Sequence, residues 1–571
     1  MGFRARSSGA LLTTIGVRKV GQVPDALSPE GTRAVRMDRS QADVPSAGSA
    51  RAASAFFAVA VVASGIVFIR EARRSWFGYD DWDFLAARTA GDLHGLLVPH
   101  GDHWSTVPIL TYRALWNLFG LEFTPYVVVA VALHLATAVL LRVVMRRAGV
   151  DPWIATAAAT LFAFFGAGYE TTTKLFALSF GGWPLVLGLC QLILADHEGP
   201  WRRRDWLGLL AGLGAVASSA VGVPMVLSVG VATWWRRGAR IALGHTVPIA
   251  LIYAAWYVGF AESAGGASPE SVLRFVHTGV RGVLLDLGQS WPLAILLGVV
   301  LVAGLVLARS QWSADSSRAS ASMPIGLLVG LLAFLVLTGH GRAEPVPIFG
   351  DLARLSHYAD VAAVMILPAV AYAATAIGRR YSPLMPVLAV LLLVGIPGNV
   401  AALHDGVERE GGAFARDLML SLPRAPAART APPDLPPEPL LAAPVTIGWL
   451  VDALDSGRVP PPDRAPTELE AEQILLRLTL WQTDGMRVVE PCTRSVGPVV
   501  RHLEAWGNVS LSTHAEVDVA VLGNEGWSAP VKYGQPFTNR YVVRLGQSLT
   551  PTRPVSLQFT SANSAEFELC G

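Results

Sequence analysis

Three carboxylates lie within four residues in the segment 79–84, Tyr-Asp-Asp-Trp-Asp-Phe. Adjacent carboxylates repel each other, so one of them is expected to have a raised pKa or to share a cation, and either state suits a general base that acts on a hydroxyl group. The flanking aromatic side chains favour a membrane interface. We interpret Asp80 and Asp81 as candidate catalytic residues; the alternative is a helix cap with solvated acids.

A second polar cluster follows about twenty residues later, where His100, Asp102 and His103 precede Arg113. Two histidines three residues apart beside an aspartate could bind a divalent cation, with Asp81 (or its neighbour Asp80) completing the set. The histidines and Arg113 could instead donate hydrogen bonds to a phosphate or a sugar, or they could pack the loop against neighbouring helices. The spacing matches no closed zinc pattern, so all three interpretations stay open.

A third cluster contains Arg342, Arg354, His357 and Tyr358. A guanidinium matches phosphate oxygens in bidentate fashion, so these arginines suit an anionic head group at a membrane surface. The alternative is that they pair with neighbouring acids. The turn at 169–174 is predicted to be held by a salt bridge. His134 lies within an apolar run, where an ionisable residue is either hydrogen-bonded or functional.

The composition excludes several classes of protein. Of the 571 residues, 52% are hydrophobic and 15% are charged, whereas a soluble protein has about 25% charged residues. A plain soluble enzyme is therefore excluded. Forty-five Lys and Arg against 43 Asp and Glu give a net charge of +2, so nucleic acid is not an expected partner.

Apolar runs near the ~20 residues that span a bilayer predict a polytopic α-helical membrane protein. The run at 206–235 is too long for one span and is interrupted by Ser218, Ser219, Gly222 and Pro224, which predicts two short helices joined by a turn. This gives about eleven transmembrane helices. The apolar runs lie near 52–70, 124–141, 152–168, 175–194, 206–235, 242–260, 290–308, 322–338, 357–377 and 384–402.

Arginine placement predicts the orientation. With the N-terminus in the cytoplasm, the inner loops are rich in arginine and most outer loops are poor in it, as the positive-inside rule requires. Arg70, Arg73 and Arg74 are the exceptions, because they follow the first span on the outer side. The first outer loop, 71–123, is unusually long, and long ordered loops are often functional. We expect a plasma-membrane protein whose C-terminal domain is extracytoplasmic.

The sequence divides into four predicted parts. Residues 1–53 form a disordered cytoplasmic tail, and 54–404 form the bundle. Residues 405–484 form a proline-rich, extended connector with short helices, including a helical stretch near 467–481. Short alternating strands, such as those at 516–522, 540–545 and 555–559, then predict a small β-sandwich-like domain over 485–571.

Three cysteines are too few for a disulfide-rich scaffold. Cys190 lies in an apolar run and is interpreted as a small buried hydrophobic residue. Cys492 and Cys570 lie near the two ends of the C-terminal segment, and a disulfide between them could staple it in an oxidising compartment.

The first span, the acidic pair beyond it, the long outer loop and the many short spans resemble the GT-C superfamily of membrane glycosyltransferases. The arabinofuranosyltransferases of actinobacterial cell walls belong to that superfamily. The resemblance covers 54–404 as architecture, and its only local motif is Asp80-Asp81. It implies a sugar donor carried on polyprenyl phosphate and an acidic base, Asp80 or Asp81, toward the acceptor hydroxyl. Several members carry an outer carbohydrate-binding module, which the β-domain would match.

The sequence therefore predicts a glycosyltransferase that moves a sugar from a polyprenyl-phosphate donor to an envelope glycan, lipid or protein acceptor on the outer face. One alternative is a transporter or flippase of lipid-linked envelope precursors. Transporters often have repeated halves with charges near the midplane, whereas here the polar residues gather in outer loops. Another alternative is a non-catalytic membrane scaffold that displays a sugar-binding domain, which would leave the acidic pair without a role.

Overall fold

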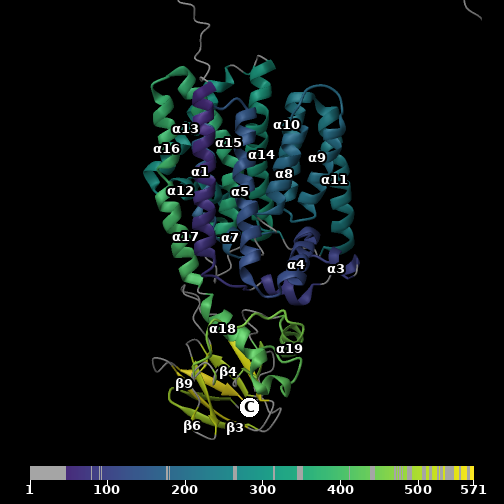
Figure 1. Cartoon of the computed structure of the whole chain (residues 1–571), viewed down its shortest axis with the longest axis vertical. Coiled ribbons are helices and arrows are strands. Elements are labelled where there is room, and N and C mark those ends of the chain that lie inside the picture. The colour runs from purple at the N-terminus through teal and green to yellow at the C-terminus, as the bar shows by residue number, and fades with distance from the viewer. Residues whose placement is uncertain are drawn as a thin grey trace, which may run out of the picture. The chain divides into compact units, whose positions relative to one another are not determined.

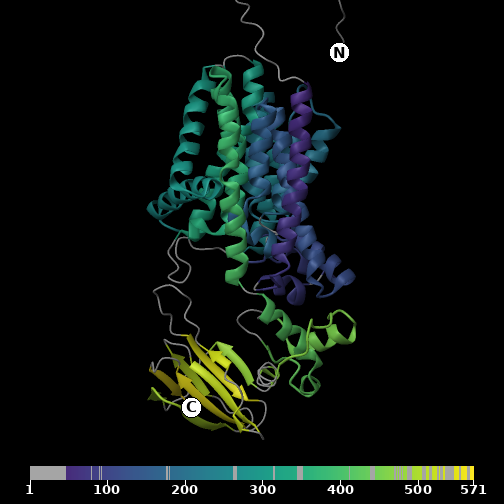
Figure 2. The same cartoon turned by 60° about the vertical axis from the view of Figure 1, so that its left-hand side comes forward.

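The structure is a computed structural model, and the bundle of helices that it forms is shown in Figures 1 and 2. The predicted tail lies outside the described residues up to position 46, but 47–53 already belong to the first helix. The described residues run from 47 to 570, apart from 79, 89, 92, 175–177, 179–180, 262–265, 311, 313–314, 344–351, 411, 438–443, 468–470, 472–473, 475–476, 479, 485–491, 504–508, 514–516, 524–525, 528–530, 534–544, 552–554 and 562–565.

Seven described helices are long and apolar enough to cross a membrane. Four further helices of the bundle have 12 to 16 residues. Each predicted apolar run contains a helix, but the count of about eleven spans is not confirmed. The seven are α1 (Ala47–Ala72), α5 (Phe123–Arg147), α11 (Ala239–Phe260), α13 (Trp291–Arg309), α14 (Asp315–Arg342), α15 (Ser356–Arg380) and the consecutive pair α16 (Leu384–Leu393) and α17 (Ile396–Glu410).

The predicted break in the run at 206–235 is confirmed. Helix α9 (Arg203–Val216) ends before a short turn, and α10 (Gly222–Arg237) begins directly after it. A Cβ atom on Gly222 would lie 2.4 Å from the carbonyl carbon of Ala215, so only glycine lets the two helices approach this closely. The other two short helices are α6 (Pro152–Ala163) and α8 (Trp183–Ala195).

Helix α15 forms the centre of the bundle. Of the residues in its most apolar stretch of 18, 83% are buried inside the protein, whereas the corresponding share in α1 is 33%. Small residues explain the difference, because they let backbones pack closely in a membrane. A Cβ atom on Gly304 of α13 would lie 2.3 Å from the carbonyl oxygen of Ala373 in α15. Helix α1 instead exposes large apolar side chains, as expected for a lipid-facing helix.

The segment 71–123, for which we keep the name first outer loop after its predicted side, folds into short helices at one end of the bundle (Figure 1). They are packed by a buried aromatic cluster in which Phe77 contacts Tyr126 edge-on and Phe84 stacks on Tyr112. The loop is therefore an ordered platform. Its elements are α2 (Asp80–Trp82), the π-helical turn η1 (Asp83–Ala87), α3 (Leu93–Leu97) and α4 (Thr106–Phe119).

The described residues of the segment 413–459 form short helices, as expected for the proline-rich connector, but they pack together and are not extended. It contains α18 (Ala413–Ser421), the 3-10 turns η5 (Leu422–Arg424) and η6 (Pro426–Arg429), and α19 (Ile447–Asp455). Their apolar side chains join the core that also holds the first outer loop, and Leu422, Leu435 and Leu450 are fully buried. Pro423 and Pro426 lie at the start of the two 3-10 turns, a position that is compatible with helical geometry.

Trp449 of α19 contacts two tryptophans of the outer loop. Its ring stacks on that of Trp116, with 5.0 Å between the ring centroids, and meets Trp82 edge-on at 6.4 Å. The backbone N–H of Leu121 donates to the carbonyl oxygen of Arg458 at 2.8 Å. A Cβ atom on Gly120, whose φ is +56°, would lie 2.2 Å from that oxygen. The two segments therefore meet backbone to backbone.

The C-terminal strands form two antiparallel sheets that share a small buried core. Small C-terminal sheets are thus confirmed, but the described strands do not close into a sandwich. One sheet has the order β1 (Leu480–Asp484), β8 (Leu545–Pro551), β4 (Val509–Thr513), β10 (Phe567–Cys570) and β2 (Cys492–Ser495). The other has the order β3 (Val499–Leu503), β9 (Val555–Ser561), β5 (Val517–Gly523) and β6 (Gly526–Trp527), and β7 (Val531–Tyr533) also pairs with β5.

The start of the sheets differs from the prediction. Strand β1 begins at Leu480, before the predicted boundary at 485, and replaces the end of the helical stretch predicted near 467–481, part of which lies outside the described residues. Its register with β8 decides its conformation, which short-range periodicity does not reveal. Strands β5 and β9 match predicted strands, whereas 540–544 lie outside the described residues.

Cys492 and Cys570 lie directly opposite each other in the pairing of β2 with β10. Cys492 is disulfide-bonded, and Cys190 is free. The structure therefore brings together the two residues of the predicted bridge.

Candidate active site

The acidic pair Asp80-Asp81 begins helix α2, eight residues after the end of α1. Asp81 is fully buried. Its Oδ1 accepts a hydrogen bond from the Tyr112 hydroxyl at 2.7 Å, and its Oδ2 accepts one from the backbone N–H of Gly78 at 3.1 Å. Asp80, in contrast, leaves 53% of its side chain exposed. The two adjacent carboxylates therefore differ in what they can do: one is held inside, and the other is open to a ligand.

His100 lies between two carboxylates. Its Nδ1 is 2.6 Å from Oδ2 of Asp83, and its Nε2 is 3.5 Å from Oδ2 of Asp80. Burial alone would lower the pKa of His100, but the hydrogen bonds and negative charges of Asp80 and Asp83 raise it to about 9. Burial likewise opposes ionisation of Asp83, yet His100 and Arg88 lower its pKa. His100 is therefore an imidazolium at neutral pH and is shared by two acids.

Arg88 helps to bring together Asp83 and His100, which are seventeen positions apart in the sequence. Its Nε is 3.0 Å from Oδ2 of Asp83, and its other nitrogens donate to the carbonyl oxygens of Val98 at 3.2 Å and Pro99 at 2.7 Å. The π-helical turn η1 ends at Ala87, and the N–H of the next residue, Arg88, donates to the Asp83 carbonyl at 2.9 Å. Turns of this π-helical kind are rare in proteins, but those that occur are often at functional sites. Arg88 thus clamps both ends of the segment between Asp83 and His100.

His103 differs from His100 in charge, although their backbones pair in a tight turn. Burial, together with the nearby positive charges of Arg342 and His100, lowers the pKa of His103 to about 4. Arg342, at the end of α14, reaches Asp102 of the same turn, with 3.5 Å between its guanidinium and Oδ2. His103 is therefore a neutral imidazole among cations. The structure brings His100, His103 and Arg342 into one cluster.

His357 extends this cluster from α15. Its Nδ1 is 2.7 Å from Oε2 of Glu170 in the short helix α7 (Glu170–Thr173), and the Ser356 hydroxyl donates to the same oxygen at 2.5 Å. Burial disfavours the Glu170 anion, but the hydrogen bond and charge of His357 lower its pKa to about 2. Lys174 lies 4.0 Å from the other carboxylate oxygen. The predicted salt-bridged turn is present and is tied to α15.

Three further predicted substrate-binding residues have structural partners. Arg113 donates two hydrogen bonds to the carbonyl oxygens of η1. Arg354 lies 3.4 Å from Asp286 of the amphipathic helix α12 (Pro269–Gly288). Tyr358 is buried and contacts the rings of Phe275 and Phe334 edge-on. These contacts hold the three side chains in place, and their role in substrate binding stays a prediction.

The predicted metal ligands Asp81, His100, Asp102 and His103 do not form a metal site in the described part of the chain, where no group of three or more His, Cys, Asp or Glu is arranged to hold an ion. Asp81 accepts from Tyr112, and His100 pairs with Asp83. We therefore assign no metal ligand. The cations of the cluster are instead side chains, His100 and Arg342.

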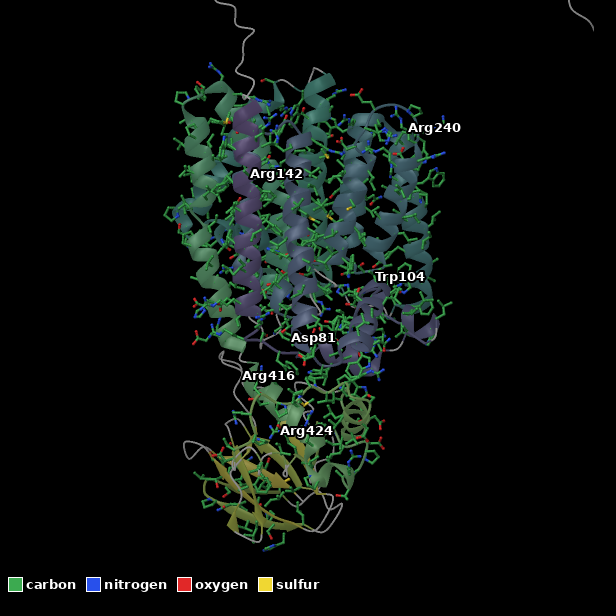
Figure 3. The ribbon with its side chains drawn as sticks, viewed as in Figure 1. Asp81, Trp104, Arg142, Arg240, Arg416 and Arg424 are labelled. Atoms are coloured by element: carbon green, nitrogen blue, oxygen red, sulfur yellow. The ribbon has the colours of Figure 1, made fainter. Side chains whose placement is uncertain are left out.

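The sequence interpretation left out Asp83 and Tyr112 as site residues. Asp83 follows Asp80 by three residues, which places both on one face of a helical turn, so a signal for it was present. No local pattern marks Tyr112, because it meets Asp81 only through the packing of α4 on α2. Figure 3 labels Asp81 near the end of the bundle that holds the outer loop, with Arg142 and Arg240 towards the other end.

A second ionisable pair lies inside the bundle. His134 of α5 and Asp360 of α15 are both buried, with 3.8 Å between Nδ1 and Oδ1. The His134 ring lies between those of Phe68 and Phe162. Neither carboxylate oxygen of Asp360 has a hydrogen-bond partner among the described groups. Ionisable residues that are buried between membrane helices are rare and often mark functional sites.

Comparisons with known proteins give one similar structure. No family model matches the chain, and no curated protein matches it. Among solved structures, ArnT from Cupriavidus metallidurans in the apo state is similar over 67% of this chain and 82% of its own length, with a TM-score of 0.41 and 14% sequence identity. A likeness at this level carries no inference about the site residues.

Proposed function

We propose that the chain is a multi-pass membrane glycosyltransferase that moves a sugar from a polyprenyl-phosphate donor to a hydroxyl acceptor. One observation carries the proposal: of two adjacent carboxylates, Asp80 is exposed beside the imidazolium of His100, whereas Asp81 is buried and hydrogen-bonded. Asp80 is the general base. Asp81 is a positioning residue, because it fixes the start of α2 through Tyr112.

The proposed reaction is a direct displacement. The acceptor hydroxyl gives its proton to the Asp80 carboxylate while its oxygen forms a bond to the anomeric carbon of the sugar. The bond between that carbon and the phosphate oxygen breaks, and its electron pair leaves with the polyprenyl phosphate. Arg342 and His100 supply positive charge near this point. The isoprenoid tail stays against the apolar helices, which keeps the phosphate at the membrane interface.

The proposed acceptor is a cell-envelope glycan, lipid or protein, in the manner of actinobacterial cell-wall enzymes, and the C-terminal sheets would bind the acceptor glycan. This requires the site to face outward. In a protein with Cys190→Ala, a cysteine at Ser456, which is exposed after α19, should react in intact cells with a thiol reagent that does not cross membranes. A cysteine at the exposed Arg203 should not react. The reverse pattern would place the site in the cytoplasm and contradict the proposal.

Single substitutions test the base. The full-length protein in lipid nanodiscs is offered a panel of polyprenyl-phosphate pentoses and hexoses, with an envelope fraction as acceptor. We expect Asp80→Asn to lower transfer about 100-fold or more and to leave thermal stability almost unchanged, because the side chain is exposed. Glu122→Gln, an exposed acid of the same loop, is the matched control. Full activity of Asp80→Asn would exclude Asp80 as the base.

A transporter of lipid-linked envelope precursors is the second candidate, and the buried His134 and Asp360 pair favours it. Transporters place ionisable residues between helices near the midplane. The two functions give opposite results in proteoliposomes. An enzyme loses sugar transfer with Asp80→Asn, whereas a transporter keeps translocating its lipid with that substitution and loses translocation with Asp360→Asn.

A further inference from the structure

We propose that a pocket lined by arginines at the end of α1 binds the phosphate group of a membrane lipid, at a site separate from the Asp80 cluster. The pocket has a volume of about 390 Å³, which falls within the range of small-molecule sites. We call it the Arg73 pocket. Its lining residues are Arg73, Arg74, Ser75, Val407, Glu408, Gly412 and Arg416.

The charges of the Arg73 pocket favour an anion. Three guanidinium groups and one carboxylate line it. Two of the arginines are paired with acids: Arg74 lies 3.0 Å from Oε2 of Glu71, and Arg416 contacts Asp417 and Asp463. The carboxylate in the lining, Glu408, lies 3.6 Å from His404.

Arg73 is the exception among these arginines. No carboxylate oxygen of the described side chains lies within 4 Å of its guanidinium, and the side chain is exposed at the pocket. A guanidinium offers five donors in a planar fork that matches phosphate oxygens. The lining therefore leaves one such fork available for an anionic ligand.

The start of α18 adds to the positive potential. Gly412 is the residue before the first turn of this nine-residue helix and lines the pocket. The first N–H groups of a helix lack partners within it and attract anions. A Cβ atom on Gly412 would lie 2.4 Å from the backbone nitrogen of Trp76. Glycine therefore lets α18 begin directly against the segment that carries the arginines.

The position of the pocket indicates that the phosphate belongs to a lipid. Two candidate membrane spans, α1 and α16 with α17, end at its lining residues, so it lies at the level of lipid head groups. Helix α1 also exposes an apolar stripe along its length, formed by Phe56, Val59, Val62 and Ile66. Residues three and four apart share one helix face, so the stripe leads towards Arg70 and the pocket. The acyl chains of a lipid would lie along it.

The same ligand would explain why arginines occur at this end of α1. In the proposed orientation Arg73 and Arg74 lie on the outer side, where the positive-inside rule disfavours them. An arginine that serves only to orient the chain in the membrane would lie on the cytoplasmic side. Binding of a lipid phosphate gives these residues a reason to be where they are.

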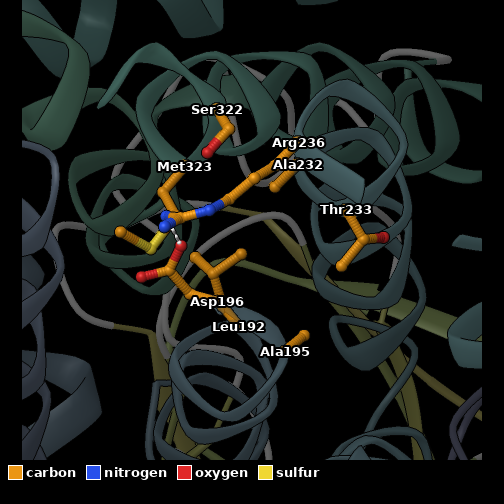
Figure 4. Close-up of a pocket in the computed structure, with 8 residues that line it drawn as sticks. All are labelled: Leu192, Ala195, Asp196, Ala232, Thr233, Arg236, Ser322 and Met323. Atoms are coloured by element: carbon orange, nitrogen blue, oxygen red, sulfur yellow. Dashed lines mark hydrogen bonds and ion pairs between the residues drawn. The ribbon is translucent and has the colours of Figure 1, made fainter. Parts of the chain in front are cut away.

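A second described pocket shows the contrast. It lies among α8, α10 and α14, has a volume of about 10 Å³, and contains the ion pair of Arg236 with Asp196 (Figure 4). That space admits a single water molecule. In this pocket the arginine is neutralised by its own carboxylate, whereas the Arg73 pocket is large and leaves a guanidinium available.

The test measures binding, not sugar transfer, so its outcome is independent of the proposed function. Full-length protein is titrated with phosphatidylglycerol, phosphatidylcholine or inorganic phosphate, and bound lipid is counted by native mass spectrometry. We expect phosphatidylglycerol to bind more tightly than phosphatidylcholine and Arg73→Gln to weaken it about three- to fivefold, the effect of one exposed ion pair. Arg73→Lys should restore part of the affinity, because it keeps the charge without the fork.

Arg70→Gln is the matched control, because it removes the same charge from the last turn of α1 outside the pocket lining. It should change the affinity by less than about twofold. Equal losses of affinity in Arg73→Gln and Arg70→Gln would indicate attraction by diffuse surface charge and would overturn the proposal of a specific site in the Arg73 pocket. Binding of inorganic phosphate that depends on Arg73, without preference for phosphatidylglycerol, would assign the site to a soluble phosphate. No Arg73-dependent binding of either probe would refute the proposal.

Discussion

His100 and Asp83 are seventeen residues apart in the sequence, yet Nδ1 of the imidazole lies 2.6 Å from the carboxylate oxygen Oδ2. This contact fixes the ring so that its other nitrogen faces Asp80 at 3.5 Å. The position of the exposed Asp80 carboxylate thus depends on the partly buried Asp83 carboxylate through the imidazolium that they share. The His100 and Tyr112 contacts, the packing of α19 and the disulfide of Cys492 are each open to a direct test.

The first concerns pH. The pKa of His100 is raised from 6.5 to about 9, so its stabilising contribution is fully present below pH 6.5 and is lost as the pH rises through 9. Thermal melting between pH 6 and 10 should therefore show a decline near pH 9 in the native protein. His100→Gln should lower stability at pH 7 and flatten that decline. Equal slopes for the two proteins would contradict the pairing.

The second concerns Tyr112. Removing its hydroxyl with Tyr112→Phe leaves Oδ1 of the buried Asp81 without its donor, which should lower the free energy of unfolding by about 1–3 kcal/mol. Denaturant titration measures the loss. Tyr126→Phe, whose hydroxyl donates to the carbonyl oxygen of Gly120 at 2.9 Å, is a control for the loss of a phenol elsewhere in the same core. Only Tyr112→Phe should also lower the turnover rate while leaving KM little changed.

The third concerns the contact between α19 and the outer loop. Trp449→Ala removes the ring that stacks on Trp116 and meets Trp82, and should cost about 2–3 kcal/mol. Limited proteolysis should then cut within 413–459 much faster than in the native protein. Trp449→Phe should keep most of the protection, because an aromatic ring remains. Unchanged cleavage of Trp449→Ala would show that this stack does not hold the segment in place.

The fourth concerns Cys492. Non-reducing peptide mapping of protein from intact cells should recover Cys492 linked to Cys570, its partner in register across β2 and β10. Replacing both residues by serine should destabilise the C-terminal sheets by about 2–5 kcal/mol. Cys190→Ser serves as the control, because that thiol is free. Recovery of both thiols in reduced form would refute the bridge.

Much of the fold was predictable because it depends on local composition. Apolar runs, the break at 218–224 and the alternating strands are properties of neighbouring residues, and helices and strands form where such patterns occur. The span count is not confirmed, since four helices in the predicted apolar runs have 12 to 16 residues, fewer than the ~20 that span a bilayer. The short helices of the connector were predicted, but their packing was not, because proline content is a local property whereas the contact with Trp116 joins residues far apart in the chain.

The sequence by itself determined that this is a helical membrane-type protein with an acidic pair and histidines in its first long loop. It could not rank Asp80 against Asp81, because the two are identical in type and adjacent. Only the tertiary structure decided that Asp81 is buried against Tyr112 and that Asp80 stays exposed beside His100. The physical reason is that burial and hydrogen bonding are set by residues distant in the chain, and these contacts form only when α4 packs on α2 and η1.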